Sequence, residues 1–475
     1  MSSPLSVLRS PLVMFTPMPP ARTGVAHYAS MLVPALQKHV EVKVVTEHGE
    51  RRTENGERIY QLGNNPHHEW IYKEAMQTPG VIVLHDIVLH HLIVEMTLAR
   101  GDIEGYVAAL EANHGEAGAA WARGRAAGLH SEMGNFLLPA SIDVANRSKA
   151  VIVHNRYSAD RLRSLGVQTP IHVVPHPFEP HEDARAKRDE VRARHGFTDK
   201  HRVIGMFGFL TSAKRSEVVL EAFEKARHQM PDLRLLVVGE PAPNIDRIAF
   251  GADGITFSGY VSDEEFAAHF AAVDRLVNLR YPTAGETSGT LIRAFEAGRP
   301  VAVSDYAQFA ELPGDCVVKV PFGEGEVASL ADFFLRDLPD PSAAQREWLA
   351  RNARMDLTVA GYLSTVQHPG TRHAALGTRH SVPLFVNLEL IGADATSITI
   401  RNAGESVLRA RAYGEPGYHV IANGRWLELP GDLKPGAAIT VDLPLEMHGH
   451  IVELVHAVYG VPEVDPEAWD RVAIQ

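Results

Sequence analysis

The residues best suited to chemistry lie in a short loop between an apolar run and a helical pattern. Glu286, Thr287, Ser288 and Gly289 follow the run RLVNLR. The loop therefore falls where a predicted parallel strand ends and a helix begins, which is the usual ligand position in open α/β sheets. Helix N–H groups there suit phosphate, and a carboxylate, which only accepts hydrogen bonds, suits sugar hydroxyls. An ordinary capped turn is the alternative.

A second candidate set lies in GFLTSAKRSEVVLEAF, after another predicted strand. Lys214 and Arg215 stand at a helix start, where cations oppose the helix dipole unless an anion is near. A bound diphosphate would supply that anion, with Gly208 in the same loop and Lys214 exposed to solvent. Solvated surface charges are the alternative. The chain lacks the phosphate-binding loop of nucleoside triphosphatases, and Gly205-x-x-Gly208 does not match the dinucleotide fingerprint.

A third set gathers histidines at the end of the run GVIVLHD. His85 could point into a ligand site with Asp86 polarising it, while His90 and His91 follow at the start of a helical stretch. Two other interpretations stay open, a metal site and a set of capping or solvated histidines. The chain contains no Asp-x-Asp pair to hold a metal against a diphosphate. We expect no metal site.

Two successive α/β patterns must position these residues. Each half holds about six short apolar runs alternating with helical segments, which predicts two doubly wound parallel sheets facing a ligand cleft. Residues 87–148 should be mostly helical. The runs are 11–16, 41–47, 57–63, 80–86, 150–155 and 171–178 in the first half, and 202–209, 234–240, 255–261, 275–280, 300–305 and 316–321 in the second.

The pattern predicts five segments with different characters. They are an N-terminal Rossmann-like domain (1–178), a charged linker with a short helix (179–200), a C-terminal Rossmann-like domain (201–340), return helices (341–374) and an all-β domain (375–475). The last segment shows seven short alternating strands, with Asn423–Gly424 as a type I′ hairpin signal. These features favour an immunoglobulin-like sandwich that braces the enzyme or serves oligomer contacts, with carbohydrate binding as the alternative.

Composition limits the classes of function. The 475 residues are too many for one core, and a net charge of −12 argues against general nucleic-acid binding. A single cysteine, Cys316, excludes intramolecular disulfides and Cys-based zinc sites. No apolar run reaches the roughly 18 residues of a membrane span, and the N-terminal run is too short for a signal peptide. We therefore expect a cytoplasmic protein.

Taken together, the motifs resemble the retaining glycosyltransferases of family four, which have the two-Rossmann GT-B fold. The likeness covers roughly residues 10–370. It rests on TGVAHY, GNNPHHEWIY with VLHD, VIVHNRYSADRL, GFLTSAKRSEVVLEAF, FSGYV, and GETSGTLIRAFEAGRPVAVSD followed by FAEL. The order and spacing of these motifs carry the assignment.

The resemblance implies a role for each matching residue. His85, Glu286 and Lys214 take the catalytic positions, the first near the reacting carbon and the last on the diphosphate. The resemblance also implies donor-binding positions: Gly24 near the phosphates, the main chain of Val261 at the nucleobase, and Thr287, Ser288 and Gly289 in the loop that holds the sugar. Gly208 and Arg293 complete this donor-binding set. Two positions depart from the family pattern. Arg293 replaces the second motif glutamate, and Phe209 replaces a common phosphate-binding arginine.

The implied activity is metal-independent transfer of a sugar, with retention, from a nucleotide-sugar donor. The donor is a substrate, so no cofactor is expected. The acceptor would be a glycan, lipid-linked or protein molecule, as in bacterial polysaccharide biosynthesis, and a lipid-linked acceptor could bring the protein to a membrane surface. Two other hypotheses are a non-catalytic nucleotide-sugar or glycan-binding relative, suggested by Arg293 and Phe209, and a metal-dependent hydrolase centred on His85.

Overall fold

The computed structural model divides the chain into two units. Unit 1 comprises Met1–Glu179, Ala284–Thr287 and Asn352–Leu384, and unit 2 comprises Pro180–Thr283, Ser288–Arg351 and Phe385–Gln475. Described residues are 10–21, 23–47, 56–129, 133–180, 184–208, 210–240, 253–370, 388–393, 397–402, 418–422, 425–428, 433–434, 436–442 and 452–456.

Unit 1 is built on a six-stranded parallel sheet with the order β2-β1-β3-β4-β5-β6. Its strands are rich in Val, Ile and Leu, as expected when helices cover both faces. The strand order reverses between β1 and β3, so the carboxyl ends of these strands mark a topological switch point. The strands are β1 (Leu12–Phe15), β2 (Val42–Val45), β3 (Glu57–Leu62), β4 (Val81–Leu84), β5 (Ala150–Val153) and β6 (Ile171–Val173).

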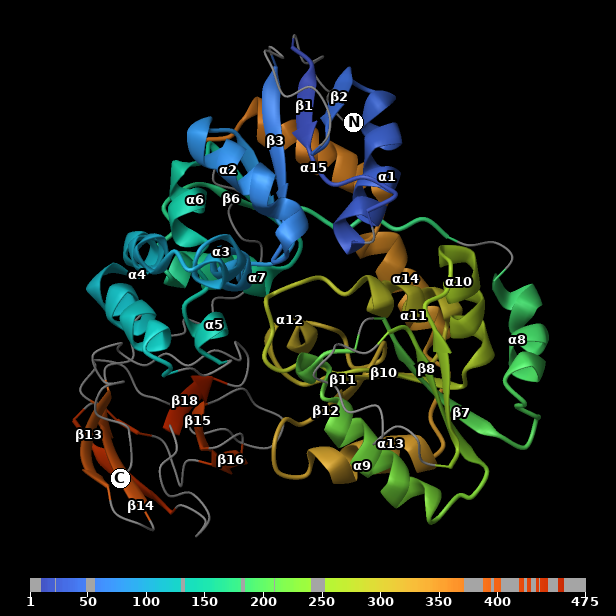
Figure 1. The fold of residues 1–475 in the computed structure, drawn as a ribbon. Helices are drawn as coiled ribbons and strands as arrows, with labels where there is room; N and C mark the ends of the chain where they lie inside the picture. Colours follow the sequence, from blue (N-terminus) through green and yellow to red (C-terminus); the bar gives the residue numbers. More distant parts are fainter. Residues whose placement is uncertain are drawn as a thin grey trace. The chain divides into compact units, whose positions relative to one another are not determined.

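Helices from both ends of the chain cover this sheet (Figure 1). The late helix α15 (Met355–Gln367) packs on α1 (Gly24–Gln37), where the Tyr362 and Tyr28 hydroxyl oxygens lie 2.8 Å apart. Residues 87–148 are mostly helical, as predicted. The other helices are η1 (Pro66–His68), α2 (Glu69–Gln77), α3 (His90–Met96), η2 (Leu98–Arg100), α4 (Ile103–Ala126), α5 (Gly134–Leu137), α6 (Ile142–Arg147) and α7 (Arg156–Ser164).

Unit 2 repeats the architecture with the order β12-β11-β10-β7-β8-β9, and its switch point lies between β7 and β10. The two sheets confirm the prediction of two doubly wound, Rossmann-like halves. Each predicted run of the two halves contains all or most of one strand. They are β7 (Arg202–Phe207), β8 (Leu233–Val238), β9 (Ile255–Gly259), β10 (Arg275–Asn278), β11 (Val301–Ser304) and β12 (Val318–Val320).

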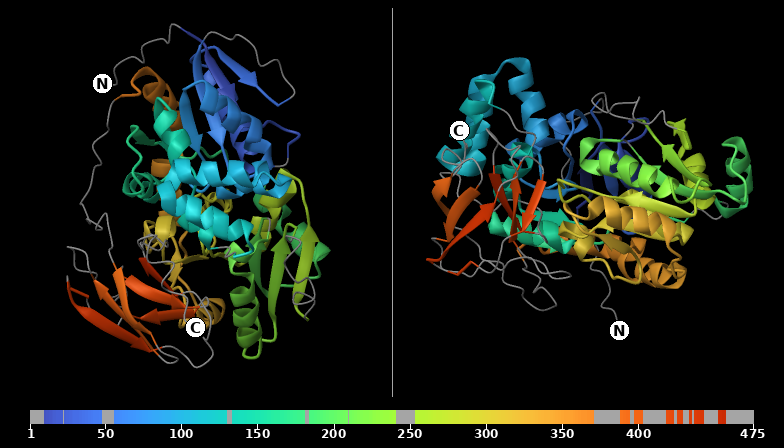
Figure 2. Two further views of the ribbon diagram at one scale, coloured as in Figure 1. Left: turned by 60° about the vertical axis from the view of Figure 1, so that its left-hand side comes forward. Right: turned by 90° about the horizontal axis from the view of Figure 1, so that it is seen from below.

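Helices cover both faces of the unit 2 sheet as well (Figures 1 and 2). On one face α9 (Ser216–Arg227) and α13 (Glu326–Leu335) pack together over buried aliphatic side chains. On the other, Phe270 of α10 (Asp263–Ala272) stacks on Phe207 with ring centroids 3.9 Å apart. The remaining helices are η3 (Ala184–Lys187), α8 (Arg188–Arg194), η4 (Ser212–Lys214), α11 (Gly289–Ala297), α12 (Ala307–Ala310) and α14 (Ser342–Asn352).

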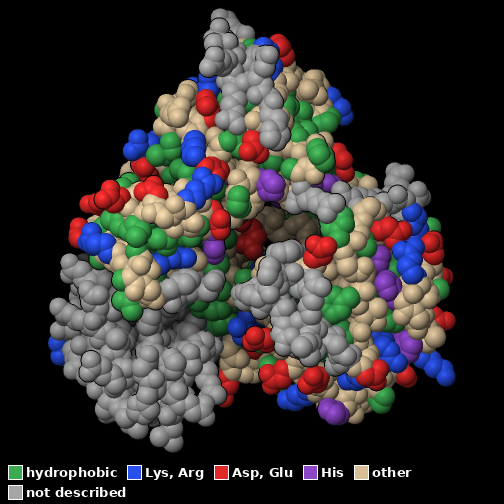
Figure 3. Space-filling model, in the orientation of Figure 1, with side chains coloured by type: hydrophobic (Ala, Val, Ile, Leu, Met, Phe, Trp, Pro, Cys, Tyr) green, Lys and Arg blue, Asp and Glu red, His purple; other side chains and the backbone are tan. Residues whose placement is uncertain are grey.

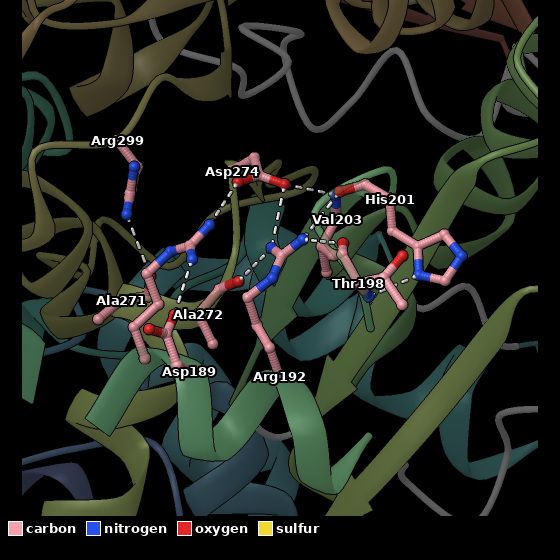
Figure 4. Close-up of polar contacts among 10 residues, drawn as sticks. Asp189, Arg192, Thr198, His201, Val203, Ala271, Ala272, Asp274 and Arg299 are labelled. Atoms are coloured by element: carbon pink, nitrogen blue, oxygen red, sulfur yellow. Dashed lines mark hydrogen bonds and ion pairs between the residues drawn. The ribbon is translucent and has the colours of Figure 1, made fainter. Parts of the chain in front are cut away.

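A buried arginine fixes α8, the short helix predicted in the charged linker. Figure 4 shows the Arg192 guanidinium between Asp274 and three carbonyl oxygens. It donates hydrogen bonds to the Ala272 oxygen at 2.9 Å, the Thr198 oxygen at 2.8 Å and the His201 oxygen at 2.9 Å, and its Nη1 lies 3.3 Å from Asp274 Oδ2. Arg192 thereby joins α8 to the end of α10 and to the segment that enters β7.

The described part of the tail consists of antiparallel strands in two sheets, ordered β13-β14-β17 and β16-β15-β18. The predicted turn Asn423–Gly424 lies outside the described residues, as do residues 407–412, the third of the seven predicted strands. The immunoglobulin-like packing of these sheets stays a prediction. The strands are β13 (Leu388–Ala393), β14 (Ser397–Asn402), β15 (Tyr418–Ala422), β16 (Arg425–Glu428), β17 (Ala438–Asp442) and β18 (Val452–His456).

Charges of both signs are interspersed over the described surface on the face drawn in Figure 3. Many of them form exposed ion pairs within one helix, such as Arg351 with Glu347 and Arg147 with Asp143. A search of the described helices finds none with the length and apolarity that a membrane span requires.

Candidate active site

Two loops meet at the switch point of unit 2. One follows β7 and the other follows β10, and the Tyr281 N–H donates to the Ala213 carbonyl oxygen at 2.7 Å to join them. At the end of β10 the Ser288 hydroxyl donates to Asn278 Oδ1 at 3.1 Å. These contacts bring the predicted phosphate-binding residues of the two loops to one edge of the sheet.

The second loop leads into α11, whose N-terminus is open. Ser288 caps this helix, since its Oγ accepts the Leu291 N–H at 3.2 Å. Gly289 is exposed, and a Cβ placed on it would meet no heavy atom within 4 Å. Gly298 ends the helix in the left-handed conformation, with φ 68°, as the sequence predicted. The first-turn N–H groups of a helix lack intrahelical acceptors, so this open end suits an anion.

Lys214 lies at the same edge but is buried, which corrects the expectation of an exposed side chain. It is 8% exposed, and its Nζ donates to the Phe207 carbonyl oxygen at 2.6 Å. Gly208 has a φ of +83°, and a Cβ there would lie 2.8 Å from Lys214 Nζ and 3.7 Å from Thr290 Oγ1. The ammonium group therefore lies over Gly208, near the first turn of α11.

Arg215 has a different role from the one considered for it. Its backbone takes the left-handed conformation before α9, and its guanidinium pairs with Glu326 at 2.5 Å. The Glu326 carboxylate is 2% exposed, and the guanidinium carbon also lies 4.8 Å from the centre of the Phe322 ring. The anion near Arg215 is thus a buried carboxylate of the protein, and the diphosphate hypothesis rests on Lys214.

The loop Ala284–Thr287 belongs to unit 1. The Ile87 N–H donates to the Ala284 oxygen at 2.7 Å, and the Gly285 oxygen accepts from Asn155 Nδ2 and Ser158 Oγ, each at 2.8 Å. Asn155 Nδ2 also donates to Thr287 Oγ1 at 3.2 Å. Four hydrogen bonds thus fix a loop of four residues.

Gly285 is required by this packing. Its φ is +76°, and a Cβ would lie 2.6 Å from Ser158 Oγ and 2.9 Å from Ile87 Cγ1. Only glycine adopts such a backbone conformation and such a close approach without strain. The loop geometry that holds Glu286 therefore depends on a residue that carries no side-chain chemistry of its own.

Glu286 lies close to a second carboxyl group. Its Oε2 accepts the Ala284 N–H at 3.0 Å, within the same loop. Burial, together with the Glu286 charge, raises the pKa of Asp86 to about 7, although the Asn64 N–H donates to Asp86 Oδ2 at 2.8 Å and opposes the shift. Asp86 thus exchanges a proton near neutral pH beside the loop proposed to hold sugar.

His85 follows β4 and is surrounded by polar rings. Its Nε2 lies 2.6 Å from Gln61 Oε1, and its ring centre lies 4.6 Å from that of Tyr28 and 5.2 Å from that of His154. Burial lowers the pKa of His85 well below its ordinary value, and the neighbouring imidazoles lower it further. His85 is therefore a neutral imidazole at physiological pH.

The other predicted histidines have separate surroundings. His90 is fully buried, with Nδ1 2.5 Å from the Leu138 oxygen and Nε2 2.6 Å from the Tyr106 hydroxyl. His91 Nδ1 lies 2.7 Å from Asn64 Nδ2. Among the described residues, no group of three or more His, Cys, Asp or Glu side chains is arranged to hold a metal ion.

The remaining predicted residues are distributed over three elements. Gly24 is exposed at the start of α1, where a Cβ would meet no heavy atom within 4 Å, and Val261 follows β9. Arg293 Nη1 lies 3.0 Å from Glu296 Oε2 within α11, and both side chains are mostly buried. Phe209 lies outside the described residues.

Sequence reasoning missed the residues that hold the loop and orient the histidine. Asn155, Ser158 and Gln61 had no assigned role, although VIVHNRYSADRL was among the quoted motifs. An Asn that follows a strand and precedes a helix is a capping signal, and Asn155 does cap α7 by accepting the Ser158 N–H. Asn155 Nδ2 also donates a hydrogen bond to the loop about 130 positions later, and no pattern in the sequence indicates that contact.

Comparisons with known proteins find a matching family model and a similar enzyme. Residues 201–338 match the family model described as Glycosyl transferases group 1. A 2-deoxystreptamine glucosyltransferase from Streptomyces kanamyceticus is 30% identical over 197 residues, which make up 38% of this chain and 50% of that protein. The chain thus spans half the length of this relative. The segment that matches the group 1 model contains all six strands of the unit 2 sheet.

Solved structures with weaker likeness cover three quarters of this chain. Anabaena HepE in complex with UDP-glucose has 14% identity and a TM-score of 0.47, over 75% of this chain and 100% of that one. WaaG, described as a glycosyltransferase involved in lipopolysaccharide biosynthesis, has 16% identity and a TM-score of 0.48, over 75% and 99%.

Proposed function

We propose that this protein transfers a sugar from a nucleotide-sugar donor to a hydroxyl-bearing acceptor, with retention of anomeric configuration. The observation that carries the proposal is the edge of the unit 2 sheet, where Lys214 lies beside the open N-terminus of α11. This edge falls within the segment that matches the group 1 glycosyl transferase model.

The chemistry of that edge suits a leaving diphosphate. In glycosyl transfer negative charge develops on the phosphate oxygen that leaves the anomeric carbon, and groups fixed in advance stabilise it most effectively. Lys214 supplies one positive charge, and the N–H groups of Gly289 and Thr290 supply the positive end of a helix dipole. Because these groups can carry the developing charge, we propose a metal-independent reaction.

We assign the other predicted residues to the sugar, the nucleobase, the phosphates and the reacting carbon of the donor. Glu286 and Thr287 accept hydrogen bonds from sugar hydroxyls. A carboxylate only accepts hydrogen bonds, so it suits a sugar hydroxyl and would repel a phosphate. The main chain at Val261 meets the nucleobase, and the open backbone at Gly24 approaches the phosphates. His85, a neutral imidazole, lies near the reacting carbon.

The donor and acceptor are proposed by class. The similarity to a glucosyltransferase makes nucleotide-activated glucose the first donor to test. The acceptor is proposed as a glycan, a lipid-linked saccharide or another polyhydroxylated molecule, such as the aminocyclitol named for that relative.

A ligand screen followed by an activity assay tests the proposal. Thermal shift of the full chain against uridine, guanosine, adenosine and thymidine diphosphate sugars should identify a stabilising donor, because a ligand that binds only the native state raises the melting temperature. That donor should then be hydrolysed or transferred in the presence of EDTA, and NMR of the product should show the donor's anomeric configuration. Binding without turnover across an acceptor panel would favour a non-catalytic nucleotide-sugar-binding protein, and inhibition by EDTA would contradict the metal-independent mechanism.

A further inference from the structure

A buried chain of hydrogen bonds leads from His85 to α15. Gln61 of β3 is fully buried, and its side-chain amide lies between the His85 ring and the Tyr362 hydroxyl. Tyr362 in turn contacts the Tyr28 hydroxyl at 2.8 Å. Four elements of unit 1 therefore each contribute one polar group to this chain.

The partners of Gln61 define which way its amide points. Nε2 lies 3.2 Å from the Tyr362 hydroxyl and 3.9 Å from Met14 Sδ, while Oε1 lies 2.6 Å from His85 Nε2. A thioether sulfur accepts hydrogen bonds and has none to donate, so it marks the nitrogen side of the amide. The amide oxygen consequently faces His85. Since that oxygen can only accept, His85 Nε2 must carry the proton.

The state of the other ring nitrogen follows from the charge of the ring. A neutral imidazole holds one N–H, and the pKa of His85 lies well below its ordinary value because of burial and the imidazoles of His154, His176 and His68. With the proton on Nε2, Nδ1 carries a lone pair. His85 is partly exposed, and Nδ1 has no hydrogen-bond partner among the described residues.

The Met14 thioether fixes the orientation of the Gln61 amide. The Gln61 N–H donates to the Tyr362 oxygen, and the Tyr28 and Tyr362 hydroxyls share a hydrogen bond in which either can be the donor. A reversed amide would place an N–H against His85 and an oxygen beside the Met14 sulfur, which has no hydrogen to donate. Tyr28 and Tyr362 stay protonated, because burial raises the pKa of each phenol.

We propose that Gln61 is a positioning residue that holds His85 as the Nε2–H tautomer, so that Nδ1 accepts a hydrogen bond from a hydroxyl of the sugar substrate. This inference rests on the proposed glycosyl transfer for the identity of its ligand. It adds a rule of specificity: the group that meets His85 must donate a hydrogen bond. A sugar with fluorine in place of that hydroxyl keeps the shape and loses the donor, so it should be a poor substrate.

The tautomer can be read without any activity assay. Long-range ¹⁵N–¹H correlation spectra of the full chain labelled with ¹⁵N-histidine distinguish Nε2–H, Nδ1–H and imidazolium rings, and His85→Gln identifies the His85 signals. We expect the Nε2–H pattern at pH 7.5. Gln61→Leu, which cannot accept a hydrogen bond, should lose that preference, and Gln61→Glu should retain it. The matched control is Gln345→Leu, since Gln345 is a fully buried amide in unit 2 that donates to the Arg299 and Cys316 oxygens. It should leave the His85 signals unchanged.

Kinetics with the donor identified by the screen then test the positioning role. Gln61→Leu should lower kcat by about tenfold to a hundredfold, the usual loss when the partner that orients a functional histidine is removed, while nucleoside diphosphate affinity stays within about twofold. Gln61→Glu should recover most of the rate. An Nδ1–H or imidazolium pattern in the unmodified protein would overturn the proposal, as would full kcat in a folded Gln61→Leu variant. An Nε2–H pattern in a protein that turns over no donor would support the tautomer assignment and contradict the proposed function.

Discussion

Lys214 is a buried cation whose Nζ donates to the Phe207 carbonyl oxygen. We expect Lys214→Met, which keeps the aliphatic stem and removes the charge, to weaken binding of the bare nucleoside diphosphate. A charge-assisted hydrogen bond is worth about 1.5–3 kcal/mol, which corresponds to a loss of roughly tenfold to more than a hundredfold in affinity. Titration calorimetry measures this directly.

A lysine on the same stretch of chain provides the control for Lys214. Lys225 is exposed near the end of α9, so Lys225→Met should change neither the affinity nor the fold. Because Lys214 is buried, its variant should also melt at a somewhat lower temperature. Unchanged diphosphate affinity in the folded Lys214 variant would remove it from the phosphate site.

Glu286 should distinguish the sugar from the nucleotide. Glu286→Gln keeps the size of the side chain and removes its charge, so affinity for the nucleotide sugar and turnover should both fall, while affinity for the bare nucleoside diphosphate should barely change. Loss of the charge also relieves repulsion on Asp86, so the pKa of Asp86 should fall from about 7 toward its ordinary value. Any limb of the pH–rate profile that reports Asp86 should move to lower pH. Equal losses for both ligands would leave Glu286 with a structural role.

Residue types at strand ends were predictable from the sequence, and their partners were not. Lys214, Ser288 and Gly289 could be placed at the ligand edge of a sheet because an apolar run and a helical pattern flank them. The pairing of Arg215 with Glu326 joins residues 111 positions apart, and no local pattern encodes such a contact. The burial of Lys214 depends on the same tertiary packing.

At the scale of elements, the buried Arg192 side chain ties α8 to two neighbouring segments. Arg192 satisfies three carbonyl oxygens that belong to the end of α10 and to the approach to β7. Arg192→Met would leave these oxygens without their donor, and each buried unsatisfied polar group costs about 1–3 kcal/mol. We therefore expect the free energy of unfolding to fall by about 2–5 kcal/mol, measured by urea denaturation followed by circular dichroism.

The same helix offers a matched control for Arg192. Arg194 is exposed and pairs with Glu265 and Glu190 at the surface, so Arg194→Met should lower the free energy of unfolding far less than Arg192→Met. If the two variants had equal stability, Arg192 would not be what holds α8 in place.

The type of each element was predictable because the spacing of hydrophobic residues along the chain differs between helices and strands. Eleven of the twelve strands of the two parallel sheets lie inside predicted apolar runs, β8 begins one residue before its run, and Ser262 and Ser288 cap helices where the sequence indicated. The strands end one to five residues before the predicted runs do. A strand stops where its backbone hydrogen bonds to the neighbouring strand stop, and the apolar residues can continue beyond that point. The assignment of Ala284–Thr287 to unit 1 could not be predicted, since it reflects contacts with Ile87, Asn155 and Ser158.

At the scale of the whole molecule, the chain repeats one architecture and then departs from it. Both α/β halves have six parallel strands and a switch point, and unit 2 carries a cation beside an open helix N-terminus at that point. Unit 1 presents a neutral histidine and an aspartate of raised pKa after β4. The halves thus share a scaffold, and the described side chains at their strand ends differ in chemistry.

The antiparallel tail should be dispensable for donor binding. Apart from Gly24, every group proposed to meet the diphosphate lies between Gly208 and Thr290, and the described tail strands pair only with one another. A chain that ends at residue 375 should therefore bind the donor with the affinity of the full chain, while acceptor use or oligomeric mass could change. Calorimetry with the donor and light scattering of both chains measure these quantities, and a cooperative melting transition confirms that the shortened chain is folded. Loss of donor binding in that folded chain would mean that the tail completes the donor site.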